Sequence, residues 1–240
     1  MVTADNRDEI LAALGYGDLK VTGRLVDASN ATLFGEIIVG DNSFNCIYKP
    51  VTGERPLWDF PDGTLANREY AAYLISEAMQ LNSVPPTLLR EGPFGFGMVQ
   101  LWIDIDEEVD LADLFRQDLP GLRNLALLDV VINNTDRKIG HLLPTPDGHI
   151  YGCDHGVTFH SEDKLRTVLW QWEQLALLDS EIAMLKVLET KLDGKAGEMI
   201  QQLITSVEFS ALKLRVARLQ EVKVFPSPSP DWPAVPWPPF

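Results

Sequence analysis

The sequence has few of the features that mark secreted, zinc-binding or membrane-spanning proteins. Its two cysteines, Cys46 and Cys153, are too few for a disulfide framework and form no CxxC pair of a zinc site, so we expect reduced, buried thiols. The four histidines lie between His141 and His160, at a spacing that fits no standard zinc motif. No apolar run approaches the roughly 20 residues that span a bilayer. The N-terminal residues lack the basic and apolar regions of a signal peptide, so we expect a cytoplasmic protein without stable membrane insertion.

Basic residues are scarce as well. Lys and Arg number 20 against 35 Asp and Glu, which gives a formal net charge of −15. Such a surface repels nucleic-acid backbones and anionic lipid headgroups, so we expect no nucleic-acid partner. A small basic cleft for an anionic ligand is still compatible with this total. Hydrophobic residues make up 45% of the 240 residues, which is enough for a packed core in one large domain or in two small lobes that share a cleft.

The first half of the chain has a β pattern interrupted by one helix. Three short segments within residues 21–50 are rich in β-branched and apolar residues, and the turns between them predict a three-stranded meander. A helix is expected over 64–81, with Thr64 as its N-cap and an apolar stripe at helical spacing. Two further strands are expected around a turn at 91–95. The order β-β-β-α-β-β is that of a kinase-type small lobe. In the third strand, alternation places Phe44, Cys46 and Tyr48 on one face and Asn45, Ile47 and Lys49 on the other.

The second half is expected to be mainly helical. Segments 106–115 and 119–132 are predicted helices, and 141–156 reads as a hairpin with its turn at Pro146–Gly148. Amphipathic helices are expected from about residue 164 to residue 222.

The last residues, 224–240, are rich in proline and cannot form a helix or a central strand. Three interpretations stay open: a disordered tail, a strap packed by Trp232, Trp237 and Phe240, or a ligand for a protein partner. We therefore divide the chain into a β-rich N-lobe over 1–103, a helical C-lobe over 104–222 and a proline-rich tail over 223–240.

Four residues supply the parts that phosphoryl transfer needs, in the expected order. A lysine must hold the nucleotide phosphates, an acid must fix that lysine, a second acid must position the acceptor hydroxyl, and oxygen ligands must hold Mg²⁺. Lys49 on the third strand, Glu69 on the next helix, Asp136 after the second long apolar helix and Asp154 before a glycine are the candidates.

The segments around these residues match a known pattern. The segments IYKP, REYAAYLI, DVVINNTDR and YGCDHG resemble signature blocks of the phosphatidylinositol 3- and 4-kinase superfamily, most closely its type II phosphatidylinositol 4-kinase branch and the small bacterial kinases related to it. The resemblance spans residues 23–172. It implies an α+β, two-lobed protein-kinase-like fold and transfer of the γ-phosphate of ATP to a hydroxyl acceptor. Because the acidic chain shows no obvious membrane-binding surface, a small molecule or a protein is as credible an acceptor of the phosphate as a lipid.

The resemblance also implies a role for each matching residue. Lys49 resembles the phosphate-binding lysine, Glu69 its glutamate partner, Asp136 the catalytic aspartate and Asp154 the Mg²⁺-binding aspartate. Ile47 would contact the adenine ring. The residues at the position of the adenine-binding hinge run from Met98 through Gln100 and Leu101 to Trp102.

One position departs from the family pattern. His141 stands where the family places a metal-binding asparagine, and an imidazole nitrogen is a poor ligand for a hard cation such as Mg²⁺. Three hypotheses follow: the metal is held by Asp154 and the nucleotide phosphates alone, the metal is Mn²⁺, or the protein is a pseudokinase that binds nucleotide without transferring phosphate.

For other residues near these blocks, a role in ligand binding and a purely structural role both remain open. The loop after the first strand has no GxGxxG, but Ser29, Asn30 and Thr32 offer amides and hydroxyls for phosphates. Lys164 and Arg166 either contact an anionic acceptor or begin a solvated helix. Arg137 and Lys138 lie where anionic groups would gather. Asp129 either bonds the catalytic loop or lies on an exposed helix face.

Overall fold

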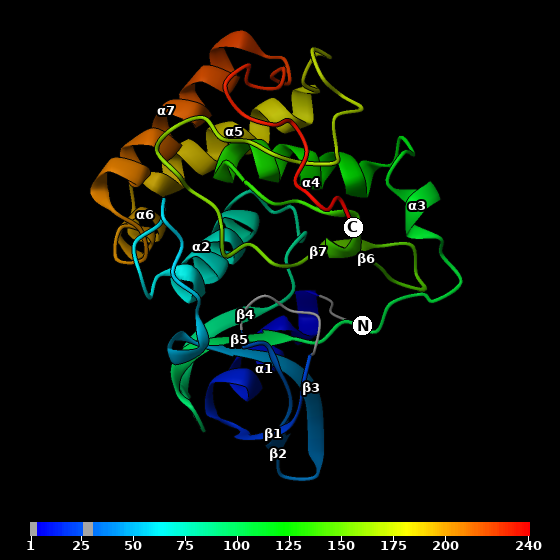
Figure 1. Cartoon of the computed structure of the whole chain (residues 1–240), viewed down its shortest axis with the longest axis vertical. Coiled ribbons are helices and arrows are strands. Elements are labelled where there is room, and N and C mark those ends of the chain that lie inside the picture. The colour runs from blue at the N-terminus through cyan, green and yellow to red at the C-terminus, as the bar shows by residue number, and fades with distance from the viewer. Residues whose placement is uncertain (1–3, 26–30) are drawn as a thin grey trace.

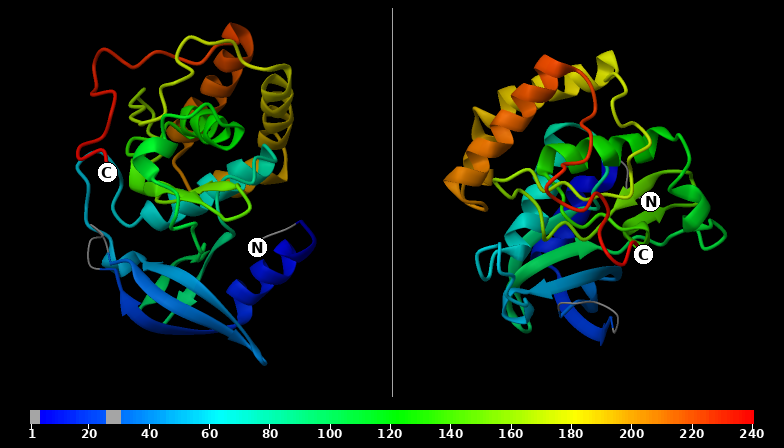
Figure 2. Two further views of the ribbon diagram at one scale, coloured as in Figure 1. Left: turned by 90° about the vertical axis from the view of Figure 1, so that its right-hand side faces the viewer. Right: turned by 45° about the horizontal axis from the view of Figure 1, so that its top comes forward.

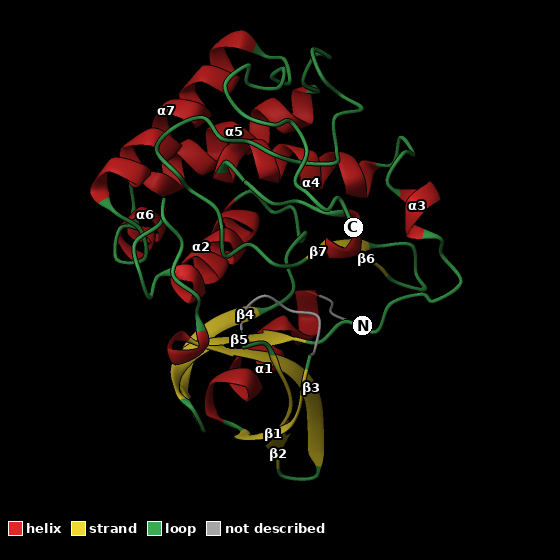
Figure 3. Ribbon diagram, viewed as in Figure 1, coloured by secondary structure: helices red, strands yellow, loops and turns green. Residues whose placement is uncertain are grey.

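The computed structural model describes residues 4–25 and 31–240. A five-stranded sheet occupies one end of the molecule and helices occupy the other (Figures 1 and 3). The elements in chain order are α1 Ala4–Tyr16, β1 Asp18–Arg24, β2 Leu33–Val39, β3 Asn42–Pro50, a 3-10 turn Val51–Gly53, α2 Leu65–Ala78, β4 Thr87–Gly92, β5 Gly95–Leu101, α3 Leu111–Leu114, α4 Pro120–Ile132, a 3-10 turn Ile139–His141, β6 Leu142–Pro144, β7 Ile150–Gly152, α5 Asp179–Leu192, α6 Lys195–Ile200 and α7 Ser206–Val222.

The sheet has the order β1-β2-β3-β5-β4, and every neighbouring pair is antiparallel. This confirms the predicted meander and the hairpin that follows the helix. The first strand begins at Asp18, earlier than the pattern from residue 21 indicated. The segment 26–30 of that expected strand and loop, which includes the nucleotide candidates Ser29 and Asn30, lies outside the described residues.

A helix that the sequence analysis did not predict covers one face of the sheet. On α1, Ile10, Ala13 and Leu14 follow helical spacing and are buried against Cys46 and Tyr48 of β3. The predicted alternation of β3 is therefore confirmed, because its Cys46 and Tyr48 face belongs to a packed core. Lys49 lies on the opposite face of the sheet, which α1 does not cover.

Helix α2 is buried on nearly all sides, and its N-terminus is capped by a distant side chain. Thr64 holds the N-cap position but makes no capping bond; its hydroxyl donates to Pro61 O instead. The carboxylate of Glu54 accepts the N–H groups of Leu65 and Ala66 at 3.0 and 2.8 Å. An acid there satisfies free amides and favours the positive end of the helix dipole. The prediction was therefore right that Thr64 is the N-cap residue and wrong that its side chain caps the helix.

The helical region is built around α4, which packs with α2 and α7. Leu122, Leu125 and Leu128 of α4 are fully buried. The helix ends at Asn133, whose left-handed backbone (φ 50°) turns the chain toward the segment that carries Asp136. Between β6 and β7, the expected turn is formed with Gly148 at a φ of 83°.

Two expectations for this region were wrong. The first predicted helix shrinks to the four residues of α3. Residues 164–178 contain no helix, because their backbone groups bond to segments far away: Arg166 N–H to Asn134 O, and Thr167 N–H to Ala234 O. Among the described residues, no helix combines the length and apolar character that crossing a membrane requires.

The proline-rich tail lies along the helical region as a strap and ends beside β6 and β7 (Figures 1 and 2). Backbone bonds hold it: Ala234 O accepts from Thr167 N–H, and Pro239 O accepts from Ile139 N–H. The indole N–H of Trp170 also donates to Ala234 O at 2.9 Å. Two of the aromatics that were expected to pack the strap, Trp237 and Phe240, are 89% and 63% exposed. Hydrogen bonds therefore fix this strap more than its aromatic side chains do.

Candidate functional site

Lys49, Glu69 and Asp154 form one ionic cluster. They come from β3, α2 and the segment after β7, and the Lys49 ammonium lies 2.6 Å from Glu69 Oε1 and 2.7 Å from Asp154 Oδ1. Burial opposes the charge of Lys49, but Asp154 and Glu69 outweigh it and raise the pKa of the lysine. Lys49 in turn holds the pKa of Asp154 well below its ordinary value. The cluster is thus a positive charge fixed between two acids that come from different parts of the chain.

The backbone around Asp154 is shaped for this contact. Asp154 has a φ of 59°, a left-handed conformation that non-glycine residues adopt rarely and mostly where neighbouring structure enforces it. The next amide, His155 N–H, donates to Glu69 Oε2 at 2.8 Å. Burial raises the pKa of Glu69, and Lys49 opposes that rise. Glu69 therefore ties β3 and the Asp154 segment to α2.

Asp136 lies after α4 and lines the same pocket as Asp154. Its main-chain N–H donates to Asn134 Oδ1 at 3.0 Å, and its carboxylate lies 3.2 Å from the Lys138 ammonium. Burial raises the pKa of Asp136, and Lys138 offsets part of that rise. A carboxylate in this setting is a better proton acceptor than an ordinary aspartate.

A buried ion pair holds the Asp136 segment in place. Asp129 and Arg137 are both fully buried and pair at 2.9 Å. Asp129 also accepts from Asn134 Nδ2 at 2.8 Å and from Thr167 Oγ1 at 3.1 Å. Arg137 donates to Cys153 O at 2.9 Å, next to Asp154. The interpretation of Asp129 as a support of this loop is the one that the geometry favours. The expectation that Arg137 faces an anionic ligand was wrong, because its partner is Asp129.

His141 contacts Asp154 rather than an open space. Its Nε2 lies 3.5 Å from Asp154 Oδ2, and its Nδ1 accepts from Lys138 N–H at 3.4 Å. Burial lowers the pKa of His141 to about 4, so the ring is neutral at physiological pH. With Nδ1 as an acceptor, the ring proton is placed on Nε2, which then has no lone pair for a metal. In this tautomer the Nε2–H group lies on the side of the ring nearest Asp154 Oδ2, at an N–O distance of 3.5 Å.

The nucleotide candidates divide between two faces of the sheet. Ile47 pairs with Gln100 and Lys49 with Met98 across β3 and β5, so these four side chains share one face. Gln100 is buried and donates to Thr87 Oγ1 at 2.8 Å. Leu101 packs on the opposite face, against the core under α1. Thr32 is buried in the segment before β2.

An aromatic pair borders the Ile47 face: Trp102 of the predicted hinge, and Phe34, which the sequence analysis missed. Phe34 lies opposite Ile47 in the sheet, and the Trp102 ring meets Phe34 edge to face at 5.0 Å. The amides of Leu101 and Trp102 already donate, to Pro86 O and Asn45 O, both at 2.9 Å. Phe34 has a sequence signal in retrospect, since it occupies the alternating face that Ile47 and Lys49 define across the strand pair.

A pocket of about 350 Å³ opens beside Asp136 and Asp154. Its other walls come from the loop before α2, the segment after Asp154 and the tail. Side chains with charged or aromatic groups that line it include Arg55, Trp58, Asp59, Lys164, Arg166 and Trp232. Trp58 was missed because it lies between the predicted third strand and the predicted helix, in a segment with no regular pattern, and Trp232 was considered only as part of the tail.

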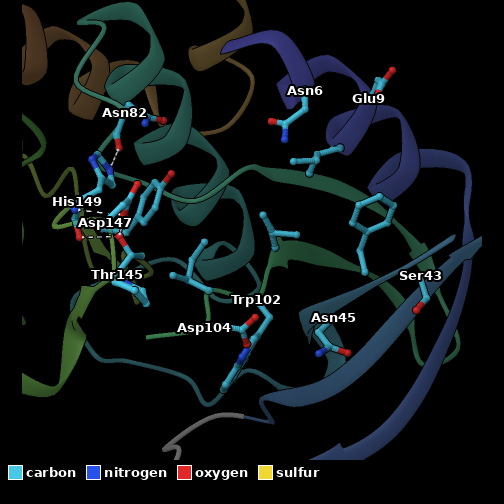
Figure 4. A pocket seen from close by; sticks show the side chains of 16 residues that line it. Asn6, Glu9, Ser43, Asn45, Asn82, Trp102, Asp104, Thr145, Asp147 and His149 are labelled. Carbon is cyan, nitrogen blue, oxygen red and sulfur yellow. Dashed lines mark hydrogen bonds between the residues drawn. The ribbon is translucent and has the colours of Figure 1, made fainter. Parts of the chain in front are cut away.

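A larger cavity of about 800 Å³ lies between α1, the segment after β5 and the β6–β7 hairpin. Figure 4 shows Asn6 of α1 on one side of it and Asp147 and His149 of the hairpin on another, with Trp102 and Asp104 along a third wall. None of Lys49, Glu69, Asp136 and Asp154 lines it. The phosphate-transfer candidates therefore gather elsewhere.

The donor set fits a metal that is shared with a nucleotide. Within residues 4–25 and 31–240, no group of three or more His, Cys, Asp or Glu side chains is placed to hold a metal by itself. Asp154 is 46% exposed at its side chain, and Asp136 supplies a second carboxylate in the same pocket. Mg²⁺ commonly takes one or two carboxylates together with substrate phosphates and water.

No family model matches the sequence. A curated relative, protein Rv2133c of Mycobacterium tuberculosis, is 42% identical over an alignment of 269 residues that covers 98% of this chain and 96% of the relative. The chain belongs to the Rv2133c family.

Solved structures show which fold this member of the Rv2133c family has. Hydra Fam20, solved with a sugar, aligns with a TM-score of 0.63 at 14% identity over 92% of this chain and 89% of its own. The Golgi casein kinase, solved with Mn and ADP, aligns with a TM-score of 0.61 at 12% identity over 92% and 76% of the two chains. The predicted mixed α and β, protein-kinase-like fold is confirmed. At these identities the likeness concerns the fold alone.

Proposed function

We propose that this member of the Rv2133c family is a kinase that transfers the γ-phosphate of ATP, in the presence of a divalent metal, to a hydroxyl acceptor. The observation that carries the proposal is the Lys49–Glu69–Asp154 cluster with Asp136 in the adjoining pocket. A kinase-like fold alone does not require these residue types at these places, since folds host many functions. A half-buried lysine held between two acids, with a third acid in the adjoining pocket, supplies the groups that phosphoryl transfer uses.

The residues would divide the reaction as follows. Lys49, oriented by Glu69, binds the phosphates, and Asp136 accepts the proton of the acceptor hydroxyl as the oxygen attacks phosphorus. Asp154, together with the nucleotide phosphates, would hold the metal, which neutralises charge on the transferring group. His141, whose Nε2 lies 3.5 Å from Asp154 Oδ2, would limit the positions that this carboxylate can take. Mg²⁺ is the first choice of metal, and Mn²⁺ the second.

The nucleotide would lie on the Lys49 face of the sheet, within an N-lobe over 1–103 that faces a C-lobe over 104–222. Ile47, Phe34 and Trp102 would supply apolar contacts to the base. Because the amides of Leu101 and Trp102 are engaged, we assign the base-pairing main-chain groups to Ile103 and Asp104. This arrangement, like the four sequence blocks, agrees with membership of the phosphatidylinositol 3- and 4-kinase superfamily, which we propose as the wider relationship.

The test compares nucleotide binding with turnover. Asp136→Ala should abolish ADP formation and leave the thermal stabilisation by ATP with Mg²⁺ or Mn²⁺ unchanged, since Asp136 acts on the acceptor. Lys49→Met should remove both. Lys20→Met, on an exposed lysine of β1, is the matched control and should change neither. Turnover that survives Asp136→Ala contradicts the assignment.

A second candidate function is a pseudokinase that binds nucleotide and regulates a protein partner through its tail. The observation that favours it is His141 at the position of the family's metal-binding asparagine. This candidate predicts stabilisation by ATP without ADP formation or autophosphorylation in either Mg²⁺ or Mn²⁺. His141→Asn provides a further comparison, because it should increase turnover if the imidazole limits metal binding.

A further inference from the structure

The pocket beside Asp136 is assembled from three parts of the chain that are distant in sequence. Trp58 and Asp59 come from the loop before α2, Lys164 and Arg166 from the segment after Asp154, and Trp232 from the tail. The side chain of Lys164 is 5% exposed and joins the three parts. Its ammonium lies 3.2 Å from Asp59 Oδ2, 4.8 Å from the centre of the Trp58 ring and 4.4 Å from that of Trp232. The walls of the pocket are therefore fixed by specific contacts.

Arg166 is the cation that this assembly leaves available. Its Nε donates to Thr135 O at 2.7 Å, and its main-chain N–H donates to Asn134 O at 2.9 Å, so the side chain is anchored on the segment that carries Asp136. Across the part of the chain that the structure describes, its terminal N–H groups donate no hydrogen bond to protein. A guanidinium fork held in this way matches the geometry of a carboxylate or a phosphate.

Among the charged groups of the pocket, which include the carboxylates of Asp59, Asp136 and Asp154, Arg166 is the one suited to a small anionic acceptor. Lys164 is neutralised by Asp59 and by Glu162, at 3.2 and 3.4 Å, and Lys138, which does not line the pocket, is paired with Asp136 at 3.2 Å. Arg166 is therefore the cation of the lining that is anchored on the Asp136 segment. Arg55 adds a third cation to the lining, although the chain as a whole carries a net charge of −15. A volume of about 350 Å³ lies at the small end of ligand sites, which run from about 300 to 1,000 Å³.

We propose that this pocket is the acceptor subsite and that it takes a small hydroxy compound with one anionic group, a carboxylate or a phosphate ester. The anionic group binds the Arg166 fork, and the hydroxyl lies against Asp136, with Trp58 and Trp232 closing the sides. The proposal rests on the proposed kinase function. In the step, the hydroxyl proton passes to the Asp136 carboxylate, the acceptor oxygen forms a bond to the γ-phosphorus, and the bond from that phosphorus to the β–γ bridging oxygen breaks to release ADP.

The experiment measures binding, so that it does not depend on turnover. The full chain is saturated with Mg²⁺ and a non-hydrolysable ATP analogue, which fills the γ-phosphate position. Glycerol 3-phosphate, glycerate and glycerol are then titrated in separate calorimetric experiments. We expect one or both anions to bind saturably and glycerol not to bind. The anion that binds more tightly identifies the phosphate or the carboxylate class.

Variants assign the binding to the pocket. Arg166→Gln should weaken the anion by about tenfold or more, the effect of losing one charge-assisted contact, and Arg166→Lys should recover part of the loss because it keeps the charge without the fork. Trp232→Ala should weaken it as well. Arg218→Gln, on an exposed arginine of α7, is the matched control and should leave the affinity unchanged. Each variant is checked for an unaltered thermal midpoint and an unaltered affinity for the nucleotide analogue.

The outcomes separate the two proposals. Failure of the nucleotide analogue to bind overturns the kinase function itself. Binding of the analogue without saturable binding of either anion overturns the acceptor assignment, as does anion binding that Arg166→Gln does not weaken. Equal binding of glycerol and glycerol 3-phosphate also overturns it, because the anionic group would then play no part.

Discussion

Replacing Arg137 with methionine would remove one half of the buried ion pair that supports the Asp136 segment. Both side chains are 0% exposed. Asp129 would lose its contacts to Arg137 Nε and Nη2 and keep those to Asn134 and Thr167. A buried charge stripped of its ionic partner typically destabilises a protein by about 3–5 kcal/mol. At roughly 2–4 °C per kcal/mol for a chain of this size, the thermal midpoint should fall by about 6–20 °C.

The assay is chemical and thermal denaturation followed by tryptophan fluorescence. The matched comparison is Lys213→Met, which breaks the ion pair with Asp193, also short at 2.6 Å but 43% and 63% exposed at its side chains. Exposed pairs contribute about 1 kcal/mol or less, so this variant should stay close to the parent. The double replacement Asp129→Leu with Arg137→Met should cost less than Arg137→Met alone, since no charge remains buried. An Arg137→Met variant as stable as the Lys213→Met variant would refute the reasoning.

Two further predictions concern the site. Burial raises the pKa of Asp136 above 3.8, and the proposed base must be deprotonated to act. We therefore expect kcat/KM for ATP to fall as the pH is lowered, with a midpoint above 3.8. A midpoint at or below 3.8 would argue against Asp136 as the base. A Cβ at Gly97 would lie 2.4 Å from Lys49 O, whereas one at Gly23 would meet nothing within 4 Å. Gly97→Ala should therefore cost about 1–3 kcal/mol and weaken ATP binding, and Gly23→Ala should do neither; denaturation and an ATP titration on both variants test this.

The parts of the fold that the sequence predicted correctly are those whose structure is determined by residues close together in the sequence. The alternation of β3 and the turn chemistry around β4 and β5 are local signals, and both hairpins formed as expected. The missed helix α1 also has a local pattern at Ile10, Ala13 and Leu14, which the analysis passed over. Residues 164–178 were mistaken for helix for a different reason. Their amphipathic pattern is real, but Arg166 and Thr167 find backbone partners at Asn134 and Ala234, which no local rule anticipates.

In the candidate site too, local sequence signals were predictive and long-range contacts were not. The residue types and their order were enough to single out Lys49, Glu69, Asp136 and Asp154, and the structure places the first, second and fourth in direct contact. Their environments could not be read from spacing. Arg137 follows Asp136 directly, yet its side chain is turned inward to Asp129. The two residues lie in an irregular segment after α4, where tertiary partners and not a regular period set the direction of each side chain.

The position of Glu69 has a consequence for how the protein acquires its activity. One carboxylate receives the Lys49 ammonium, 20 residues away, and the His155 amide, 86 residues away. The contact with His155 is the costlier of the two to form, because the entropy of closing a loop grows with its length. A chain in which Glu69 lacks either contact would hold Lys49 or the Asp154 segment less firmly, and we expect it to bind nucleotide more weakly. Nucleotide would then stabilise the finished fold alone, by about 2.7 kcal/mol at a concentration one hundred times its Kd. If the proposed function holds, ATP would in this way favour the completed fold.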